Sequence, residues 1–146
     1  GAALKAKIDK DKFKVFCLIG DGECESGSIW ESVLSASRLK IDNLVVIVDM
    51  NKMSEMQTLD SKSDIELKNK FKSYKWNSVI TNGHDFHSLN KALTKKFKNN
   101  YPTVIIANTI KGKGVSFMEN KVEWHHQAPS QHQFDLALKE YNYEKN

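Results

Sequence analysis

The stretch Phe13-Lys-Val-Phe-Cys-Leu-Ile-Gly-Asp-Gly22 decides the fold class of this chain. Its first seven residues are mostly strong β-formers, and they end at a Gly-Asp-Gly turn. A second run of strand length, Leu44-Val-Val-Ile-Val-Asp49, is almost wholly apolar. Between these runs, apolar residues recur at helical spacing over residues 28–40. Strand, turn, helix and strand form a βαβ unit, and we expect both strands to be buried and parallel.

The alternation of helical and strand-like segments continues toward the C-terminus. A helix is expected from the capping box Ser63-Asp-Ile-Glu66 to about residue 74, and another follows the capping residue Asp85. The other expected elements are a helix-forming stretch at 1–8, a strand at 76–80, a helix at 86–97, a strand at 103–108 and a helix at 130–141. Residues 110–129 show no period, and an irregular loop of that length inside a compact domain is usually functional.

These elements predict one α/β domain over residues 1–146, with a doubly wound, mostly parallel sheet and helices on both faces. Stretch 1–8 has no N-cap signal before it, so we interpret it as the end of a longer helix and expect an N-terminally truncated domain. Ligands of such sheets bind at the carboxyl ends of strands. The turns after the first two strands are therefore the expected site.

The composition disfavours several classes of function. The 22 lysines and arginines against 18 acidic residues leave a net charge of +4, and the lysines are scattered without interleaved aromatic residues. We therefore expect no nucleic-acid partner. No apolar run approaches the ~20 residues of a membrane span, so we expect no membrane contact. Cys17 and Cys24 form neither a disulfide framework nor a metal motif, and we expect both to be structural in a cytoplasmic protein.

The Gly20-Asp21-Gly22 turn combines an anion-binding backbone with a carboxylate. Glycines allow a tight turn whose amides face phosphate oxygens, but a carboxylate about 4 Å from a phosphate is repelled by ~4 kcal/mol at an effective dielectric of about 20. A bridging Mg²⁺ removes that conflict, because it prefers hard oxygen ligands and joins protein groups to phosphates. Asn51 follows the second strand and supplies an amide oxygen at the same sheet edge.

Each turn also has a simpler interpretation. Gly-Asp-Gly is a common turn, and asparagine is a common residue after a strand. A dinucleotide-binding domain is the other interpretation, but Asp21 opposes phosphate and the Gly-x-Gly-x-x-Gly context is absent. We expect the turn to be exposed at the surface, so that Asp21 can be replaced without loss of the fold.

The spacing of these turns and several longer segments resemble known enzymes. Gly-Asp-Gly, then 28 residues, then Asn51 is similar to the cofactor motif of thiamine-diphosphate enzymes. The wider resemblance is to the N-terminal part of transketolase, and it covers nearly the whole chain. It is carried by the segments Gly20-Asp-Gly-Glu-Cys-Glu-Ser-Gly-Ser-Ile-Trp-Glu31, Leu39-Lys-Ile-Asp-Asn-Leu44, Asn82-Gly-His-Asp-Phe86, Pro102-Thr-Val-Ile-Ile-Ala107 and Thr109-Ile-Lys-Gly-Lys-Gly-Val-Ser-Phe-Met-Glu119.

The resemblance implies a thiamine-diphosphate-binding fold with thiamine diphosphate and Mg²⁺ as cofactors. By that resemblance, Asp21 and Asn51 hold the metal through their side chains, and Met53 holds it through its carbonyl oxygen. The turn from Gly20 to Gly22 holds the diphosphate, to which the Gly22 amide donates a hydrogen bond.

Two further residues gain a role from the resemblance. Lys111 and His125 fall at family positions that reach the diphosphate and the substrate channel, and His125 is the implied catalytic residue. Lysine and histidine side chains beside a glycine-rich loop can donate to anionic oxygens, although a single loop histidine is more often only solvated. Residues 110–129 are accordingly the expected functional loop.

The chain departs from the transketolase pattern at named positions. Ser26 stands where transketolases usually carry a glutamate, with Glu25 one place earlier, whereas Glu31 matches the second family glutamate. His126 replaces the glycine that usually follows the family histidine. The upstream histidines of the family and the glutamate of its pyrimidine-binding domain are also absent from the sequence.

The resemblance therefore implies a component of a transketolase-like enzyme that moves a two-carbon ketol unit from a ketose to an aldose. The implied partner is a C-terminal subunit carrying the pyrimidine-binding domain, in a dimer or heterotetramer, with phosphorylated or nucleotide-linked sugars as substrates. A split enzyme and a fragment both fit the sequence. The alternatives are a 1-deoxyxylulose-5-phosphate synthase, a dihydroxyacetone synthase, another thiamine-diphosphate sugar enzyme, or a non-catalytic scaffold subunit.

Overall fold

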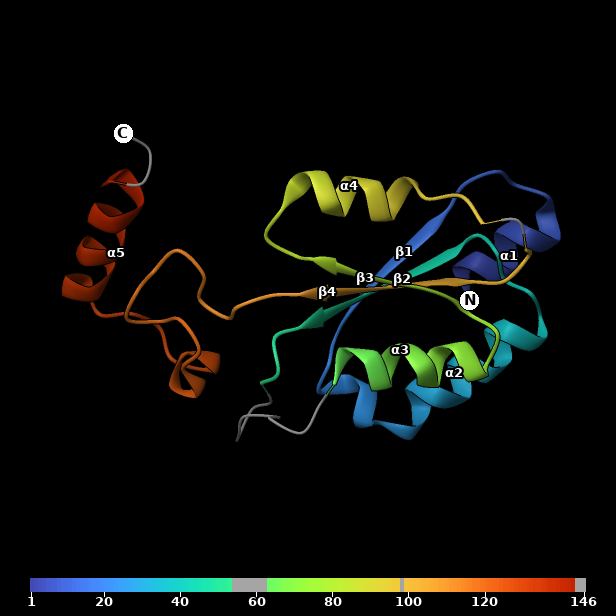
Figure 1. Ribbon diagram of the computed structural model, residues 1–146, viewed down its shortest axis with the longest axis horizontal. Coiled ribbons are helices and arrows are strands. Elements are labelled where there is room, and N and C mark those ends of the chain that lie inside the picture. The colour runs from blue at the N-terminus through green and yellow to red at the C-terminus, as the bar shows by residue number, and fades with distance from the viewer. Residues whose placement is uncertain (54–62, 98, 144–146) are drawn as a thin grey trace.

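The computed structural model describes residues 1–53, 63–97 and 99–143, which form a single parallel sheet with helices around it (Figure 1). The strands are β1 (Val15–Gly20), β2 (Leu44–Met50), β3 (Asn77–Asn82) and β4 (Thr103–Asn108). The helices are α1 (Ala2–Asp9), α2 (Gly27–Arg38), α3 (Asp64–Ser73), α4 (Phe86–Thr94) and α5 (Gln131–Tyr143), with short 3₁₀ helices η1 (Glu23–Glu25) and η2 (Val122–His125).

The sheet has the order β1-β2-β4-β3, and every pairing in it is parallel. The two central strands are the apolar runs of the sequence, because a strand covered by helices on both faces must be apolar on both. The register aligns Gly20 with Asp49, and it aligns Met50 with Asn108. The ends of β1, β2 and β4 therefore lie side by side at one edge of the sheet.

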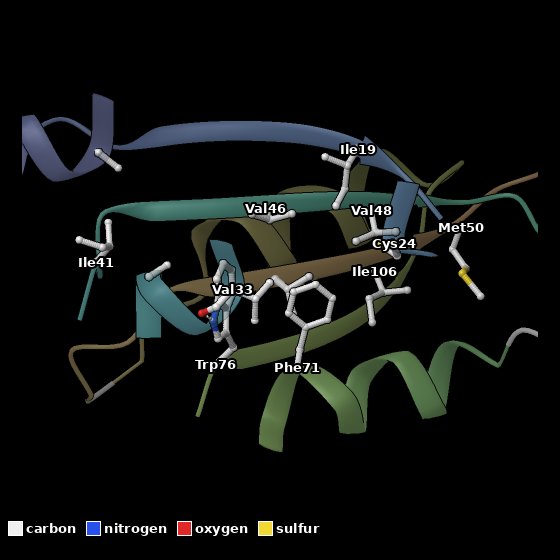
Figure 2. Close-up of a cluster of buried hydrophobic side chains, with 13 residues drawn as sticks. Ile19, Cys24, Val33, Ile41, Val46, Val48, Met50, Phe71, Trp76 and Ile106 are labelled. Atoms are coloured by element: carbon white, nitrogen blue, oxygen red, sulfur yellow. Dashed lines mark hydrogen bonds between the residues drawn. The ribbon is translucent and has the colours of Figure 1, made fainter. Parts of the chain in front are cut away.

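Helices cover both faces of this sheet, as the sequence predicted. α2 and α3 lie on one face and α4 lies on the other (Figure 1). The larger core lies under α2 and α3, where Phe71 and Trp76 pack against Val33, Val48 and Ile106 (Figure 2). Full burial of one such aromatic side chain contributes roughly 1.5–3 kcal/mol. The smaller core, under α4, consists of Val45, Ala92 and Ile105 with their neighbours. The α/β class and the doubly wound arrangement are confirmed.

Several predicted boundaries shift by a few residues. The helix expected at 86–97 ends at Thr94, because Lys95 adopts an extended conformation with ψ 127°. The strand expected at 76–80 is Asn77–Asn82, and Trp76 instead lies in the core, where its indole nitrogen donates to the Val33 carbonyl at 3.0 Å. The helix expected at 28–40 starts one residue earlier and ends at Arg38.

The prediction that the first strand is buried was wrong for most of its length. β1 is an edge strand. The helix on the face that carries Phe16 and Leu18 is α4, and it covers the other strands. Phe16 and Leu18 are consequently 54% and 70% exposed, and Cys17 is exposed as well. Cys24, in contrast, is buried. The apolar run at residues 13–19 therefore predicted a strand correctly, whereas the burial of that strand depended on whether a helix covers it.

Candidate functional site

The turns that follow β1 and β2 are joined directly by hydrogen bonds. The Asp21 amide donates to the Asp49 carbonyl at 3.1 Å, which continues the ladder of the two strands past their ends. The Lys52 amide donates to the Asp21 carboxylate at 2.8 Å. Because Lys52 follows Asn51 and precedes Met53, the carboxylate of one turn lies against the loop that carries the other two candidate metal ligands.

Asp21 is buried, contrary to the expectation that its turn is exposed. Only 1% of the residue is accessible, although it stands between two glycines in a turn. The turn lies against the loop after β2, as the bond to Lys52 shows. A buried carboxylate loses hydration and is stabilised only by hydrogen bonds or positive charge. A cation bound next to Asp21 would therefore stabilise its buried carboxylate strongly.

The Asn51 side chain is oriented by hydrogen bonds on both of its ends. Its amide nitrogen donates to Asp49 at 3.1 Å, and its oxygen accepts from the Met53 amide at 2.9 Å. The other oxygen of Asp49 accepts from the Thr109 hydroxyl. Because the bond to Asp49 fixes which end is the nitrogen, the Asn51 oxygen faces its own loop, and a carbonyl oxygen has a second lone pair for another partner.

The glycines of the first turn are compatible with close approach by a ligand. Gly22 has φ −59° and ψ −41°, an ordinary right-handed conformation that most residues adopt, so the turn itself does not demand glycine there. A Cβ at Gly20 would meet its nearest atom, from Glu23, at 3.5 Å. Among the described residues, the Gly20 and Asp21 amides are bonded within the chain, to Glu23 and Asp49, while the Gly22 amide has no such bond.

A cavity of about 460 Å³ opens beside these turns at the ends of β2 and β4. It is lined by Met50, Asn51, Lys52, Met53, Asp64, Asn108, Thr109 and Asn120. The sequence interpretation missed Asp64 and Asn108, which are bonded to each other at 2.8 Å. The buried Asn108 side-chain oxygen has no partner among the described residues. Its position at the carboxyl end of a strand was the signal that could have identified it.

The segment after β4 closes into a compact loop. The Thr109 amide donates to the Met50 carbonyl at 3.2 Å, which ties the start of this segment to the end of β2. The Asn120 amide donates to the Lys111 carbonyl at 3.0 Å, so residues 111–120 form a closed loop of turns without a regular helix or strand, as the lack of a period predicted. Gly112 is required in it, because φ is +73° and a Cβ would lie 2.6 Å from the Met118 carbonyl oxygen.

Two carboxylates secure this loop. The Glu119 carboxylate accepts from the Gly114 amide and from the Lys113 ammonium, both at 3.1 Å, and these bonds hold the pKa of Glu119 below its ordinary value. The Glu140 carboxylate, on α5, accepts from the amide and hydroxyl of Ser116 at 2.6 and 2.7 Å, and the same bonds lower the pKa of Glu140. The second contact fastens α5 to the loop, while Figure 1 shows α5 apart from the sheet.

The candidate residues thus fall into two groups. Asp21, Asn51 and Met53 lie in neighbouring, hydrogen-bonded turns, whereas Lys111 and His125 belong to the segment after β4. That segment begins beside the end of β2, two residues before Lys111. His125 lies in η2, its Nδ1 atom is buried without a partner among the described residues, and its ring packs edge-on against His126 at 4.7 Å.

The described part of the chain limits the kind of metal site that this edge can form. No cluster of three or more histidine, cysteine, aspartate or glutamate side chains able to hold a metal occurs among the described residues. A metal at this edge would therefore need amide and main-chain oxygens beside Asp21. Within the same part of the chain, none of the helices has the length and apolar character that a transmembrane span requires.

These observations define a doubly wound α/β domain with a buried carboxylate at the polar carboxyl edge of its sheet, which is the edge where such domains bind cofactors. The family model described as "Transketolase, thiamine diphosphate binding domain" matches residues 3–146. The chain belongs to the transketolase family, and residues 3–146 match the thiamine-diphosphate-binding domain of that family.

Individual relatives agree with this assignment. The chain is 34% identical over 142 residues to one subunit of the apulose-4-phosphate transketolase of Phocaeicola vulgatus, covering 96% of this chain and 50% of that protein. Its identity to the corresponding subunit from Actinobacillus succinogenes is 39%, covering 96% and 51%. It is 40% identical to human "Transketolase", covering 81% of this chain and 19% of that one. The chain thus spans about half the length of its two bacterial relatives.

Solved transketolase structures share the fold. The structure from Campylobacter jejuni superposes with a TM-score of 0.76 at 25% identity, covering 99% of this chain and 27% of that one. The structure from Leishmania mexicana gives a TM-score of 0.71 at 17% identity, covering 90% and 23%, which supports the fold only.

Proposed function

We propose that this chain binds thiamine diphosphate through Mg²⁺ and forms the diphosphate-binding part of an enzyme that transfers a two-carbon ketol unit from a ketose to an aldose. The observation that carries the proposal is the hydrogen bond from the Lys52 amide to the Asp21 carboxylate. It brings the turn after β1 against the loop after β2, which is the arrangement that a shared metal requires.

The donor set at this edge suits Mg²⁺. Asp21 supplies a nearly inaccessible carboxylate, and a divalent cation would offset the cost of burying its charge. Asn51 supplies an amide oxygen already held in place by Asp49, and Met53 supplies a main-chain carbonyl. Oxygen ligands of this kind, completed by phosphate oxygens and water, match the octahedral preference of Mg²⁺. The Gly22 amide would donate to the diphosphate.

The second group of residues would contact the diphosphate and the substrate. The Lys111 ammonium would offset charge on the diphosphate, because its loop begins where β4 meets the end of β2. His125 would hold or move a proton at a substrate oxygen, since an imidazole can donate or accept at neutral pH. Thiamine diphosphate, when bound, supplies the nucleophilic carbon that ketol transfer needs.

We also propose that the active enzyme is built from two different chains and acts on phosphorylated sugars. Two relatives that match 96% of this chain are named as one subunit of an apulose-4-phosphate transketolase, so their names specify a sugar phosphate. A C-terminal subunit with the pyrimidine-binding domain would provide the glutamate that activates the cofactor. We further propose that the two chains assemble as a dimer or heterotetramer, and that the protein is cytoplasmic.

Two other functions would use the same residues, and the experiment described below distinguishes them. A 1-deoxyxylulose-5-phosphate synthase-like enzyme would use the same metal and diphosphate residues with different substrates. A non-catalytic scaffold role is favoured by Ser26, which stands where transketolases usually carry a glutamate. Ser26 occupies the N-cap position of α2 without a side-chain capping hydrogen bond, and its hydroxyl bonds that of Ser28 at 2.8 Å.

Calorimetric titration of the chain with thiamine diphosphate, with and without Mg²⁺, tests the proposal. We expect binding that depends on Mg²⁺, and no binding at any Mg²⁺ concentration would contradict it. Addition of a candidate pyrimidine-domain subunit with ketose and aldose phosphates then separates ketol transfer from 1-deoxyxylulose-5-phosphate synthesis, which consumes pyruvate. Cofactor binding without turnover would favour the scaffold.

A further inference from the structure

His84 links the turn after β3 to the segment after β4. Its Nε2 atom accepts a hydrogen bond from the Ile110 amide at 2.7 Å, a contact that spans 26 positions of sequence. The same turn is tied to β4 a second time, since the Gly83 amide donates to the Asn108 carbonyl at 2.8 Å. A Cβ at Gly83 would lie 2.4 Å from the Thr109 methyl group, so only glycine allows this approach without movement.

Two consecutive amides of the departing segment are therefore held by different neighbours. The Thr109 amide donates to β2, at the Met50 carbonyl, and the Ile110 amide donates to the turn after β3, at His84. Lys111 is the next residue. Its carbonyl in turn closes the loop through Asn120. Contacts with both neighbours of β4 therefore determine the direction of the chain at Lys111. One of these contacts is the hydrogen bond to the His84 imidazole.

An imidazole can accept at Nε2 only when that nitrogen carries no proton, so the hydrogen bond requires neutral His84 protonated at Nδ1. The neighbouring carboxylates have partners of their own. Asp85 caps α4, and Glu119 accepts from the Gly114 amide and the Lys113 ammonium.

We propose that His84 is a positioning residue for Lys111: in its neutral form it fixes the exit of the loop from β4 and thereby sets the lysine toward the anionic part of the cofactor. This inference rests on the proposed function. Loss of the imidazole acceptor would release the Ile110 amide and loosen the loop, so cofactor affinity would fall.

The direct test is the hydrogen exchange of the Ile110 amide, followed by NMR at one fixed pH. The unaltered chain should protect this amide. His84→Phe should reduce the protection about tenfold or more. His84→Gln should keep part of it, since a carboxamide oxygen can accept. His87→Phe is the matched control, an exposed histidine three residues on, and should change nothing.

Titration with thiamine diphosphate and Mg²⁺ supplies the second measurement. His84→Phe should weaken binding about three- to tenfold, while His84→Gln should bind with less loss. Unchanged Ile110 protection in His84→Phe would overturn the inference whatever the cofactor does. Lost protection with unchanged affinity would also overturn it. If the unaltered chain shows the Ile110 behaviour but binds no cofactor, the proposed function fails and the role toward Lys111 fails with it, whereas the hydrogen bond itself stands.

Discussion

The turns after β1 and β2 and the segment after β4 serve the same edge of the sheet, but they are held in different ways. The first pair is secured by main-chain bonds and an almost wholly buried carboxylate, within one βαβ unit. The segment after β4 begins with a main-chain bond to β2, but beyond it three side chains, His84, Glu119 and Glu140, also hold it through contacts that are mostly exposed.

This difference indicates that the two regions have different roles in cofactor binding. A metal site must keep its oxygen atoms in place before the ion arrives, and the buried turns are suited to that. A loop held by exposed contacts opens at lower free energy, and such segments are commonly used to admit and release ligands. The comparison therefore predicts that changes in the turns act mainly on metal-dependent binding, and that changes after β4 act mainly on loop order.

The largest effect is expected from Asp21→Asn. This change keeps an acceptor for the Lys52 amide but removes the charge, so Mg²⁺-dependent binding of thiamine diphosphate should weaken about 100-fold or more, or about 2.7 kcal/mol. Calorimetric titration measures it. Asp42→Asn, at an exposed aspartate paired with Lys7, is the control and should bind normally. Equal affinities of the two variants would refute the metal assignment. Because Asp21 is buried, a melting curve must accompany the titration.

An intermediate effect is expected from Gly112→Ala. The added methyl group meets the Met118 carbonyl in a left-handed conformation, so the variant should lose about 1–3 kcal/mol of local stability. Hydrogen exchange of residues 111–120 reports this directly. Gly114→Ala is the matched comparison, because φ is +93° there but no atom lies within 4 Å of the new Cβ. It should lose only about 1 kcal/mol, from the left-handed conformation alone. Indistinguishable losses would mean that the Met118 contact plays no part.

The smallest effect is expected at the contact between α5 and the loop. Hydrogen bonds from Ser116 lower the pKa of Glu140, so this contact is favoured by the ionised carboxylate. It should be complete above the ordinary glutamate value of 4.5 and should be lost as the pH falls through the lowered value. The pH dependence of the Ser116 amide NMR shift measures this titration. Glu140→Gln should abolish the titration, and a curve that persists in that variant would assign it to another group.

Much of the fold could be predicted because its signals are local. The apolar runs that became β2 and β4 differ in period from the helices between them, and the capping residues Ser63 and Asp85 mark helix starts that the structure confirms. The pairing of Asp21 with the Asn51 loop was also accessible, since parallel strands end at a common edge. The assignment of those residues to Mg²⁺ stays a prediction, as do the roles of Lys111 and His125.

Contacts between polar residues far apart in sequence could not be predicted in this way. The bonds between Asp64 and Asn108, between His84 and Ile110, and between Ser116 and Glu140 follow no period and leave no mark in composition. Nor did composition reveal that Asp21 is buried while Phe16 and Leu18 are exposed.

The sequence by itself determined the order of strands and helices, the parallel βαβ unit and the membership of one cofactor-binding family, because these depend on local propensity and on motifs at set spacing. Only the tertiary structure decided which side chains are withdrawn from water and which turns touch, because burial and long-range hydrogen bonds depend on how the elements are stacked. The buried carboxylate of Asp21 and the imidazole of His84 acquire their properties at that second level.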